Sequence, residues 1–121
     1  MRKVLLIEDN AMNSRLAQFV LERGGFEVLQ AATAEVGIQI ANEREPDIIL
    51  LDLHLPGMDG LSAARLLKQS PKTRHIPIVA LTAHAMQGDE ERVVEAGCAG
   101  YITKPIDTRQ LADTVAGYLK D

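Results

Sequence analysis

Three short, almost unbroken apolar runs constrain the fold of this chain more than any other feature of its sequence. They cover residues 4–7, 48–51 and 76–81, with Pro77 near the start of the third. Apolar side chains fall on both alternating sides of each run, so both faces of the resulting strands must be covered. Two weaker strands are expected at residues 26–31 and 100–103. The runs therefore predict a parallel sheet with helices on both sides.

The segments between the strands change to the period of amphipathic helices. The first helix is expected to bury one apolar face, made of Met12, Leu16, Phe19 and Val20. It is expected to end at residues 24–25, a glycine pair, because glycine adopts the left-handed backbone of a helix end without steric cost. The second is expected to begin at an N-cap Thr33, to bury Val36, Ile40 and Ala41, and to end before Pro46.

Three further helices are predicted. The third is expected to begin at Asp59, as its N-cap, and to run toward Pro71. The segment at residues 86–96 is expected to form the weakest helix, because Gly88 lies near its start and few of its side chains are apolar. The last helix is expected to begin with a capping box of Asp107 and Gln110.

Strand and helix alternate about five times over 121 residues, which predicts one α/β domain over residues 1–121. The formal net charge is -4 and the basic side chains are scattered, so no direct nucleic-acid partner is expected. No apolar stretch is long enough to span a bilayer, so no membrane partner is expected either. The lone Cys98 and the lack of a signal peptide favour the reducing cytoplasm.

Polar residues stand at the ends of four of the predicted strands. Glu8 and Asp9 follow the first strand, Asp52 the third, Thr82 the fourth, and Lys104-Pro105 the fifth. In open α/β sheets, ligands bind beyond the carboxyl ends of the strands, where the strand order reverses. These side chains are therefore expected to meet at one edge of the sheet, although they are far apart in the sequence.

Three carboxylates gathered at one edge repel one another unless a cation offsets their charge. Mg²⁺ suits such a site because it prefers oxygen ligands and is commonly held by carboxylates together with a phosphate. Lys104 adds a second positive charge that matches a phosphoryl oxygen. Asp52 can then attack phosphorus without a base, since a carboxylate is already deprotonated at neutral pH. Thr82 is placed to donate a hydrogen bond to the transferred group.

Each of these residues also has a purely structural interpretation. The pair Glu8-Asp9 taken alone is most often a solvated turn, and Thr82 and Lys104 can be an ordinary strand-end hydroxyl and a solvated charge. Tyr101 can be a core residue with a wet hydroxyl. Only the combination of these residues, in this order, favours a functional site over these alternatives.

In that order and combination, the residues resemble the receiver domains of two-component response regulators. The matching segments are Leu6-Ile7-Glu8-Asp9-Asn10, Leu51-Asp52-Leu53-His54-Leu55-Pro56-Gly57-Met58-Asp59-Gly60, Ala80-Leu81-Thr82-Ala83 and Tyr101-Ile102-Thr103-Lys104-Pro105. Residues 85–91 and 96–98 look most like stand-alone receivers of the DivK type and receivers attached to hybrid kinases. The resemblance implies a flavodoxin-like doubly wound (βα)5 fold with parallel strand order 2-1-3-4-5.

The resemblance also implies roles for the residues at the strand ends. Mg²⁺ would be held by Glu8, Asp9, Asp52 and the backbone carbonyl of His54. Asp52, assisted by Thr82 and Lys104, would accept a phosphoryl group from a histidine kinase or a histidine phosphotransfer protein. Self-phosphotransfer and autodephosphorylation would be its only chemistry.

Further family features concern how a signal would leave the site. Thr82 and Tyr101 would form a switch pair, and the Lys104-Pro105 bond would be cis. The helix at 86–96, the last strand and the last helix would form a phosphorylation-dependent surface for a downstream effector protein. His54 and His84 are unusual at their positions, and we hypothesise that one of them affects the phosphoryl lifetime.

Other functions remain open at this point. A receiver can also serve as a phosphorelay shuttle or phosphate sink without an effector. A haloacid-dehalogenase-like phosphatase shares the aspartate, hydroxyl, lysine and magnesium, but its nucleophile follows the first strand and a second Asp stands where this chain has His54.

A flavin-binding module of this fold needs a Ser, Thr and Gly loop after its first strand. This chain has residues Glu8-Asp9-Asn10 there, and their negative charge would repel an anion.

Overall fold

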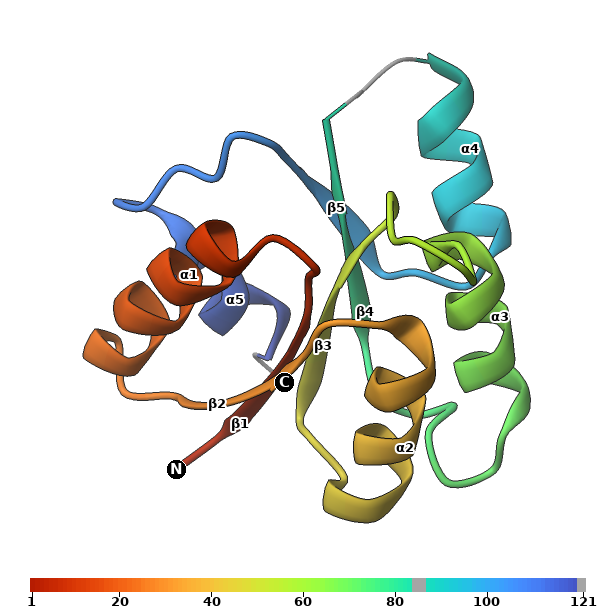
Figure 1. The fold of residues 1–121 in the computed structure, drawn as a ribbon, viewed down its shortest axis with the longest axis horizontal. Helices are drawn as coiled ribbons and strands as arrows, with labels where there is room; N and C mark the ends of the chain where they lie inside the picture. Colours follow the sequence, from red (N-terminus) through yellow and green to blue (C-terminus); the bar gives the residue numbers. More distant parts are fainter. Residues whose placement is uncertain (84–86, 120–121) are drawn as a thin grey trace.

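The computed structural model describes residues 1–83 and 87–119, where strands and helices alternate along the chain (Figure 1). The strands are β1 (Lys3–Ile7), β2 (Glu27–Ala31), β3 (Ile48–Asp52), β4 (Ile78–Thr82) and β5 (Gly100–Thr103). The helices are α1 (Ala11–Arg23), α2 (Ala34–Arg44), α3 (Gly60–Gln69), α4 (Gln87–Glu95) and α5 (Leu111–Tyr118). The strands pair in parallel in the order β2-β1-β3-β4-β5, so the predicted doubly wound fold is confirmed. The predicted helix start at Met86 and the residue His84 lie outside the described residues.

The sheet is covered on both faces, as the apolar runs predict. Every residue of β3 and β4 is buried. Alternate side chains enter two separate cores: Leu5 and Ile7 belong to one, and Val4 and Leu6 to the other. Figure 1 shows α2, α3 and α4 on one side of the sheet and α1 and α5 on the other. Of the described helices, none has the length and apolarity needed to cross a lipid bilayer.

Two predicted helix starts are confirmed and one is wrong. The Thr33 side chain accepts a hydrogen bond from the backbone N–H of Val36, and the Asp59 carboxylate accepts one from that of Ser62. At α5 the N-cap residue Gln110 makes no side-chain cap hydrogen bond. The Asp107 carboxylate accepts instead from the backbone N–H of Arg109, only two residues on. A local turn therefore takes the acceptor that the expected capping box requires.

The predicted buried face of α1 is wrong for three of its four residues, and only Val20 packs against the core, partly buried. Met12, Leu16 and Phe19 are 82%, 49% and 57% exposed, and the buried residues of this helix are Ala17 and Leu21. In α2, likewise, Val36 is exposed while the small residues Ala34, Gly37 and Ala41 are buried. Helix α2 approaches the sheet closely through these small residues, and a Cβ atom added at Gly37 would overlap Ile7 of β1. The expected burial of Ala41 is confirmed and Ile40 is partly buried, whereas the expectation for Val36 is wrong.

Two helical glycines differ in the space around them. Gly37 of α2 faces β1, and a Cβ atom added there would lie 2.7 Å from Cγ1 of the fully buried Ile7. Gly117 of α5 has open space, with no atom within 4 Å of an added Cβ. The same substitution therefore meets a packed core at one position and solvent at the other.

We expect Gly37→Ala and Gly117→Ala to change the free energy of unfolding in opposite directions. Alanine favours a helix over glycine by about 1 kcal/mol at either site, so Gly117→Ala should stabilise by about 0.5–1 kcal/mol. At Gly37 the added methyl group overlaps Ile7, and overpacking of this kind costs about 1–3 kcal/mol. Urea unfolding of both variants measures the difference. A Gly37→Ala variant as stable as Gly117→Ala would contradict the close approach of α2 to β1.

Candidate functional site

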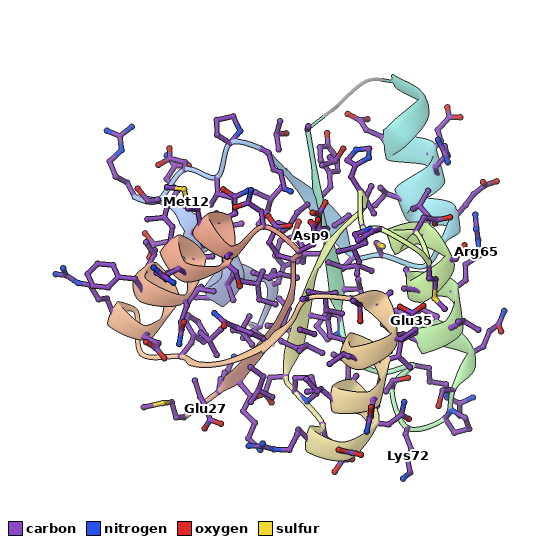
Figure 2. All side chains as sticks on the ribbon, in the orientation of Figure 1. Asp9, Met12, Glu27, Glu35, Arg65 and Lys72 are labelled. Carbon is purple, nitrogen blue, oxygen red and sulfur yellow. The ribbon has the colours of Figure 1, made fainter. Side chains whose placement is uncertain are left out.

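The polar residues at the strand ends meet at one edge of the sheet. Glu8 follows β1, Asp52 is the last residue of β3, and Thr82 is the last residue of β4. Figure 2 shows Asp9 at this edge, just beyond the end of β1. One carboxylate oxygen each from Glu8, Asp9 and Asp52 can be chosen so that all three lie within 4.8 Å of one another. The sequence prediction that these acids converge is thus confirmed.

Lys104 places its ammonium group among these carboxylates. Its Nζ atom lies 3.0 Å from Oδ2 of Asp52 and 3.2 Å from Oε1 of Glu8. The backbone N–H of Lys104 donates to the carbonyl of Thr82 at 2.7 Å, which continues the pairing of β5 with β4. The predicted cis bond between Lys104 and Pro105 is present. Lys104 follows β5, which lies beyond β4 in the sheet, so its ammonium group reaches the carboxylates from the far side of β4.

Burial controls the protonation of this cluster. Glu8 is 3% exposed and Asp52 2%, while Asp9 is exposed. Loss of water, followed by the hydrogen bond and charge of Asp52, raises the pKa of Glu8 to about 7. Burial also opposes ionisation of Asp52, but hydrogen bonds with Glu8, the His54 backbone and Lys104 outweigh it and lower the pKa of Asp52. Asp52 is therefore the ionised carboxylate of the buried pair.

The same interactions keep Lys104 charged. Its partial burial disfavours the ammonium form, but hydrogen bonding to Asp52 and the charges of Asp52 and Glu8 outweigh that cost and raise the pKa of Lys104. A fixed cation thus lies beside the ionised Asp52 at neutral pH. An added anionic group at Asp52 would meet a positive charge that is already in place.

The donor set fits a hard divalent cation. Two of the three acids are buried, and the ion pairs of the lysine ammonium are made with these two, Glu8 and Asp52. Carboxylate oxygens are the ligands that Mg²⁺ prefers, and an exposed side at Asp9 leaves room for the waters that this ion keeps. The acids present therefore suit magnesium better than a thiophilic metal.

The loop after β3 orients Asp52. The backbone N–H of His54 donates to Oδ1 of Asp52 at 2.9 Å, and the His54 side chain itself is exposed. Gly60 packs against this loop, where an added Cβ atom would lie 2.7 Å from Cα of Leu53. One oxygen of Asp52 is thus held by the loop and the other by Lys104, so the carboxylate has a fixed orientation.

Two contacts near the site were not predicted from the sequence. The Asn13 side-chain amide donates to Oε1 of Glu8 at 3.0 Å. The Tyr101 hydroxyl donates to Oε1 of Glu90 at 2.6 Å, so the tyrosine is tied to α4. Asn13 lies in the first turn of the helix after the acidic pair, and this short separation in the sequence could have suggested its contact with Glu8. No signal in the sequence pairs Tyr101 with one particular glutamate of α4.

Comparisons with known proteins agree with this geometry. A family model described as the response regulator receiver domain matches residues 4–116. The polar-differentiation response regulator DivK of Brucella ovis is 39% identical over 120 residues, which cover 99% of this chain and 98% of that protein. The DivK protein of Brucella anthropi shows the same identity and coverage.

Solved structures share the architecture. A receiver domain of a sensor histidine kinase from Pseudomonas aeruginosa, with a magnesium ion coordinated in its active site cleft, is 34% identical with a TM-score of 0.89, covering 98% of this chain and 97% of that one. A chemotaxis protein of Vibrio cholerae, at 24% identity, shows the same fold with a TM-score of 0.92 over 97% of this chain and 98% of its own. This chain therefore belongs to the response regulator receiver domains, the family of signalling modules whose function is to accept a phosphoryl group.

Proposed function

We propose that Asp52 is the residue on which this receiver domain accepts the phosphoryl group. The observation that carries the proposal is the contact of Oδ2 of Asp52 with Nζ of Lys104 at 3.0 Å, at the edge where Glu8 and Asp9 also converge. Asp52 is buried at the end of a central strand, so its carboxylate cannot swing away from this arrangement. The function is that of a phosphorylated signalling module.

The donor in this proposal is a phosphohistidine of a histidine kinase or a histidine phosphotransfer protein. A carboxylate oxygen of Asp52 attacks phosphorus, and a new P–O bond forms. The P–N bond breaks, its electron pair stays on the imidazole nitrogen, and that nitrogen takes up a proton from water. Lys104 then pairs with the phosphoryl oxygens, and the Thr82 hydroxyl donates a hydrogen bond to them.

Three carboxylates, from Glu8, Asp9 and Asp52, and the backbone carbonyl of His54 would hold Mg²⁺ in this site. When bound, the ion offsets the negative charge that builds up on the phosphoryl oxygens during transfer. Return to the resting state is hydrolysis: water attacks phosphorus, the P–O bond to Asp52 breaks, and inorganic phosphate leaves. The exposed His54 lies beside this reaction, and we propose that it affects the lifetime of the phosphoryl group.

The proposed output is a change in protein binding, in the cytoplasm, through α4, β5 and α5. This surface contains β5, the edge strand that Lys104 follows, together with the two helices that flank β5 along the chain. A downstream effector protein that prefers one arrangement of the surface would bind that arrangement better. Phosphorylation would then act as a signal without any change in the rest of the sheet.

We expect the chain to gain the mass of one phosphoryl group when it is incubated with acetyl phosphate and Mg²⁺. Asp52→Asn should gain none, because the amide is not a nucleophile toward phosphorus. Intact-mass spectrometry measures both proteins. If the Asp52→Asn variant gains as much mass as the parent, another residue is the acceptor. Steady release of phosphate from organic phosphates over many turnovers would instead favour a phosphatase.

We also expect Mg²⁺ to stabilise the folded chain. An ion that binds only the folded state raises the free energy of unfolding by about 1.4 kcal/mol at ten times its Kd. Asp9→Asn removes one carboxylate and should reduce this gain. Thermal unfolding with MgCl₂, at an ionic strength matched with NaCl, measures the effect.

The control for this measurement is Asp47→Asn, the same substitution at the opposite end of β3. Asp47 precedes the strand and its carboxylate accepts from the backbone N–H of Lys3, a contact that asparagine can keep. This variant should respond to Mg²⁺ as the parent does. An equal response from Asp9→Asn would argue against the acidic pair as the metal site.

A further inference from the structure

The hydrogen bond between Tyr101 and Glu90 joins two elements of the sheet edge, β5 and α4. The Tyr101 hydroxyl lies 2.6 Å from Oε1 of Glu90, so the bond links β5 to α4 across the surface. The tyrosine ring is partly buried against the core that α2 and α3 also share. The ring is thus fixed at its base by packing and at its tip by the glutamate.

Helix α4 has a small apolar contact with the rest of the molecule. Among its described side chains, at residues 90–95, Val93 is buried, whereas Val94 is 70% exposed. Ala96, just past the helix, is also buried. A helix with so few buried side chains depends strongly on each specific contact that it makes. The bond from Tyr101 is therefore a substantial part of what positions α4 on β5.

Tyr101 is also connected to the phosphoryl site through one short stretch of strand. It lies opposite Ala80 in the pairing of β5 with β4, and two residues later Thr103 lies opposite Thr82. The next residue is Lys104, whose Nζ atom contacts Asp52. Three residues of extended chain span about 10 Å. Tyr101 in β5 and Lys104 just after this strand are thus joined by only a few residues of backbone.

We propose that Glu90 is a positioning residue that holds Tyr101, and with it β5, in the arrangement of the unphosphorylated domain. The inference rests on the proposed phosphorylation of Asp52. In this structure Lys104 contacts the carboxylates of Asp52 and Glu8 directly, which is the resting arrangement. A phosphoryl group on Asp52 moves the partner of Lys104 outward by the length of the new P–O bond. In the proposed change the end of β5 follows this displacement, and the contact with Glu90 opposes that movement.

The position of β5 in the sheet allows such a movement. β5 is an edge strand that pairs with β4 alone, and its residues are only partly buried or exposed. The β3 strand, which carries Asp52, is buried along its whole length. When the distance between Asp52 and Lys104 changes, the edge strand moves rather than the central one. A contact that favours one position of β5 therefore changes the free energy of phosphorylation, and the coupling is reciprocal.

The expected size of the effect follows from the strength of one hydrogen bond. A side-chain hydrogen bond contributes about 0.5–1.5 kcal/mol, which corresponds to a factor of about two to ten in a rate or equilibrium. We expect Glu90→Ala to increase the rate at which acetyl phosphate and Mg²⁺ phosphorylate the full chain by about two- to tenfold. Tyr101→Phe, which removes the same bond from the other side, should give a similar increase.

The double variant and two controls make the test specific. Because the two single substitutions remove one shared bond, the double variant should be no faster than either of them. Glu91→Ala makes the same change at the neighbouring exposed residue of α4 and should keep the parental rate. Glu90→Gln removes the charge but keeps an acceptor oxygen for the Tyr101 hydroxyl, so it should keep most of the parental rate. If the charge of Glu90 were the important feature, Glu90→Gln would behave like Glu90→Ala.

A second measurement follows Tyr101 without any phosphorylation. Its hydrogen bond to Glu90, with smaller effects of burial and of the glutamate charge, raises the pKa of the Tyr101 hydroxyl. Ultraviolet titration of the tyrosines should therefore show one phenol with a lower pKa in Glu90→Ala than in the parent. Glu91→Ala should leave the titration unchanged.

The outcomes separate this inference from the proposed function. If the parent gains phosphate at Asp52 but Glu90→Ala and Tyr101→Phe react at the parental rate, the positioning role is wrong and the phosphoacceptor assignment stands. Additive effects in the double variant would also overturn the role, because two separate interactions would then be involved. A parent chain that gains no phosphate would overturn both. A titration unchanged by Glu90→Ala would show that the hydrogen bond is absent in solution.

Discussion

The burial of both faces of β1, β3 and β4 is the constraint on which the rest of this structure depends. Because helices cover both faces, polar side chains stand at or just beyond the ends of these strands. Glu8 and Asp52 are placed there with almost no exposure. Two buried carboxylates side by side are costly unless they are paired. The Lys104 ammonium, delivered by β5, offsets that cost and fixes the geometry of the site.

The fold and the positions of the site residues could largely be predicted from the sequence. Apolar runs such as residues 48–51 favour strands that are covered on both faces, and the carboxyl ends of parallel strands lie at one edge of the sheet. The convergence of Glu8, Asp52 and Lys104 follows from the topology alone. The strand order came from the family resemblance, because alternation of strands and helices is compatible with several orders.

Other features could not be predicted because they depend on tertiary packing. The buried residues of α1 are Ala17 and Leu21, while Met12 and Phe19 are exposed, because the rotation of the helix about its axis is set by its packing on the sheet. The capping box expected at α5 does not form, because the Asp107 carboxylate accepts a hydrogen bond from the backbone N–H of Arg109 in a local turn. The contact of Tyr101 with Glu90 needs the relative position of α4 and β5, which no short-range pattern contains.

The difference in burial between the central and edge strands explains how a change at one carboxylate can reach the surface. Asp52 lies on a strand that is buried throughout and packed from both sides, so the sheet centre resists displacement. Lys104 follows an edge strand that is only partly covered. In the proposed mechanism, a phosphoryl group between these two charges would be accommodated on the side of β5. Because β5 also carries Tyr101 and contacts α4, the proposed response to phosphorylation would involve this partly covered edge of the sheet.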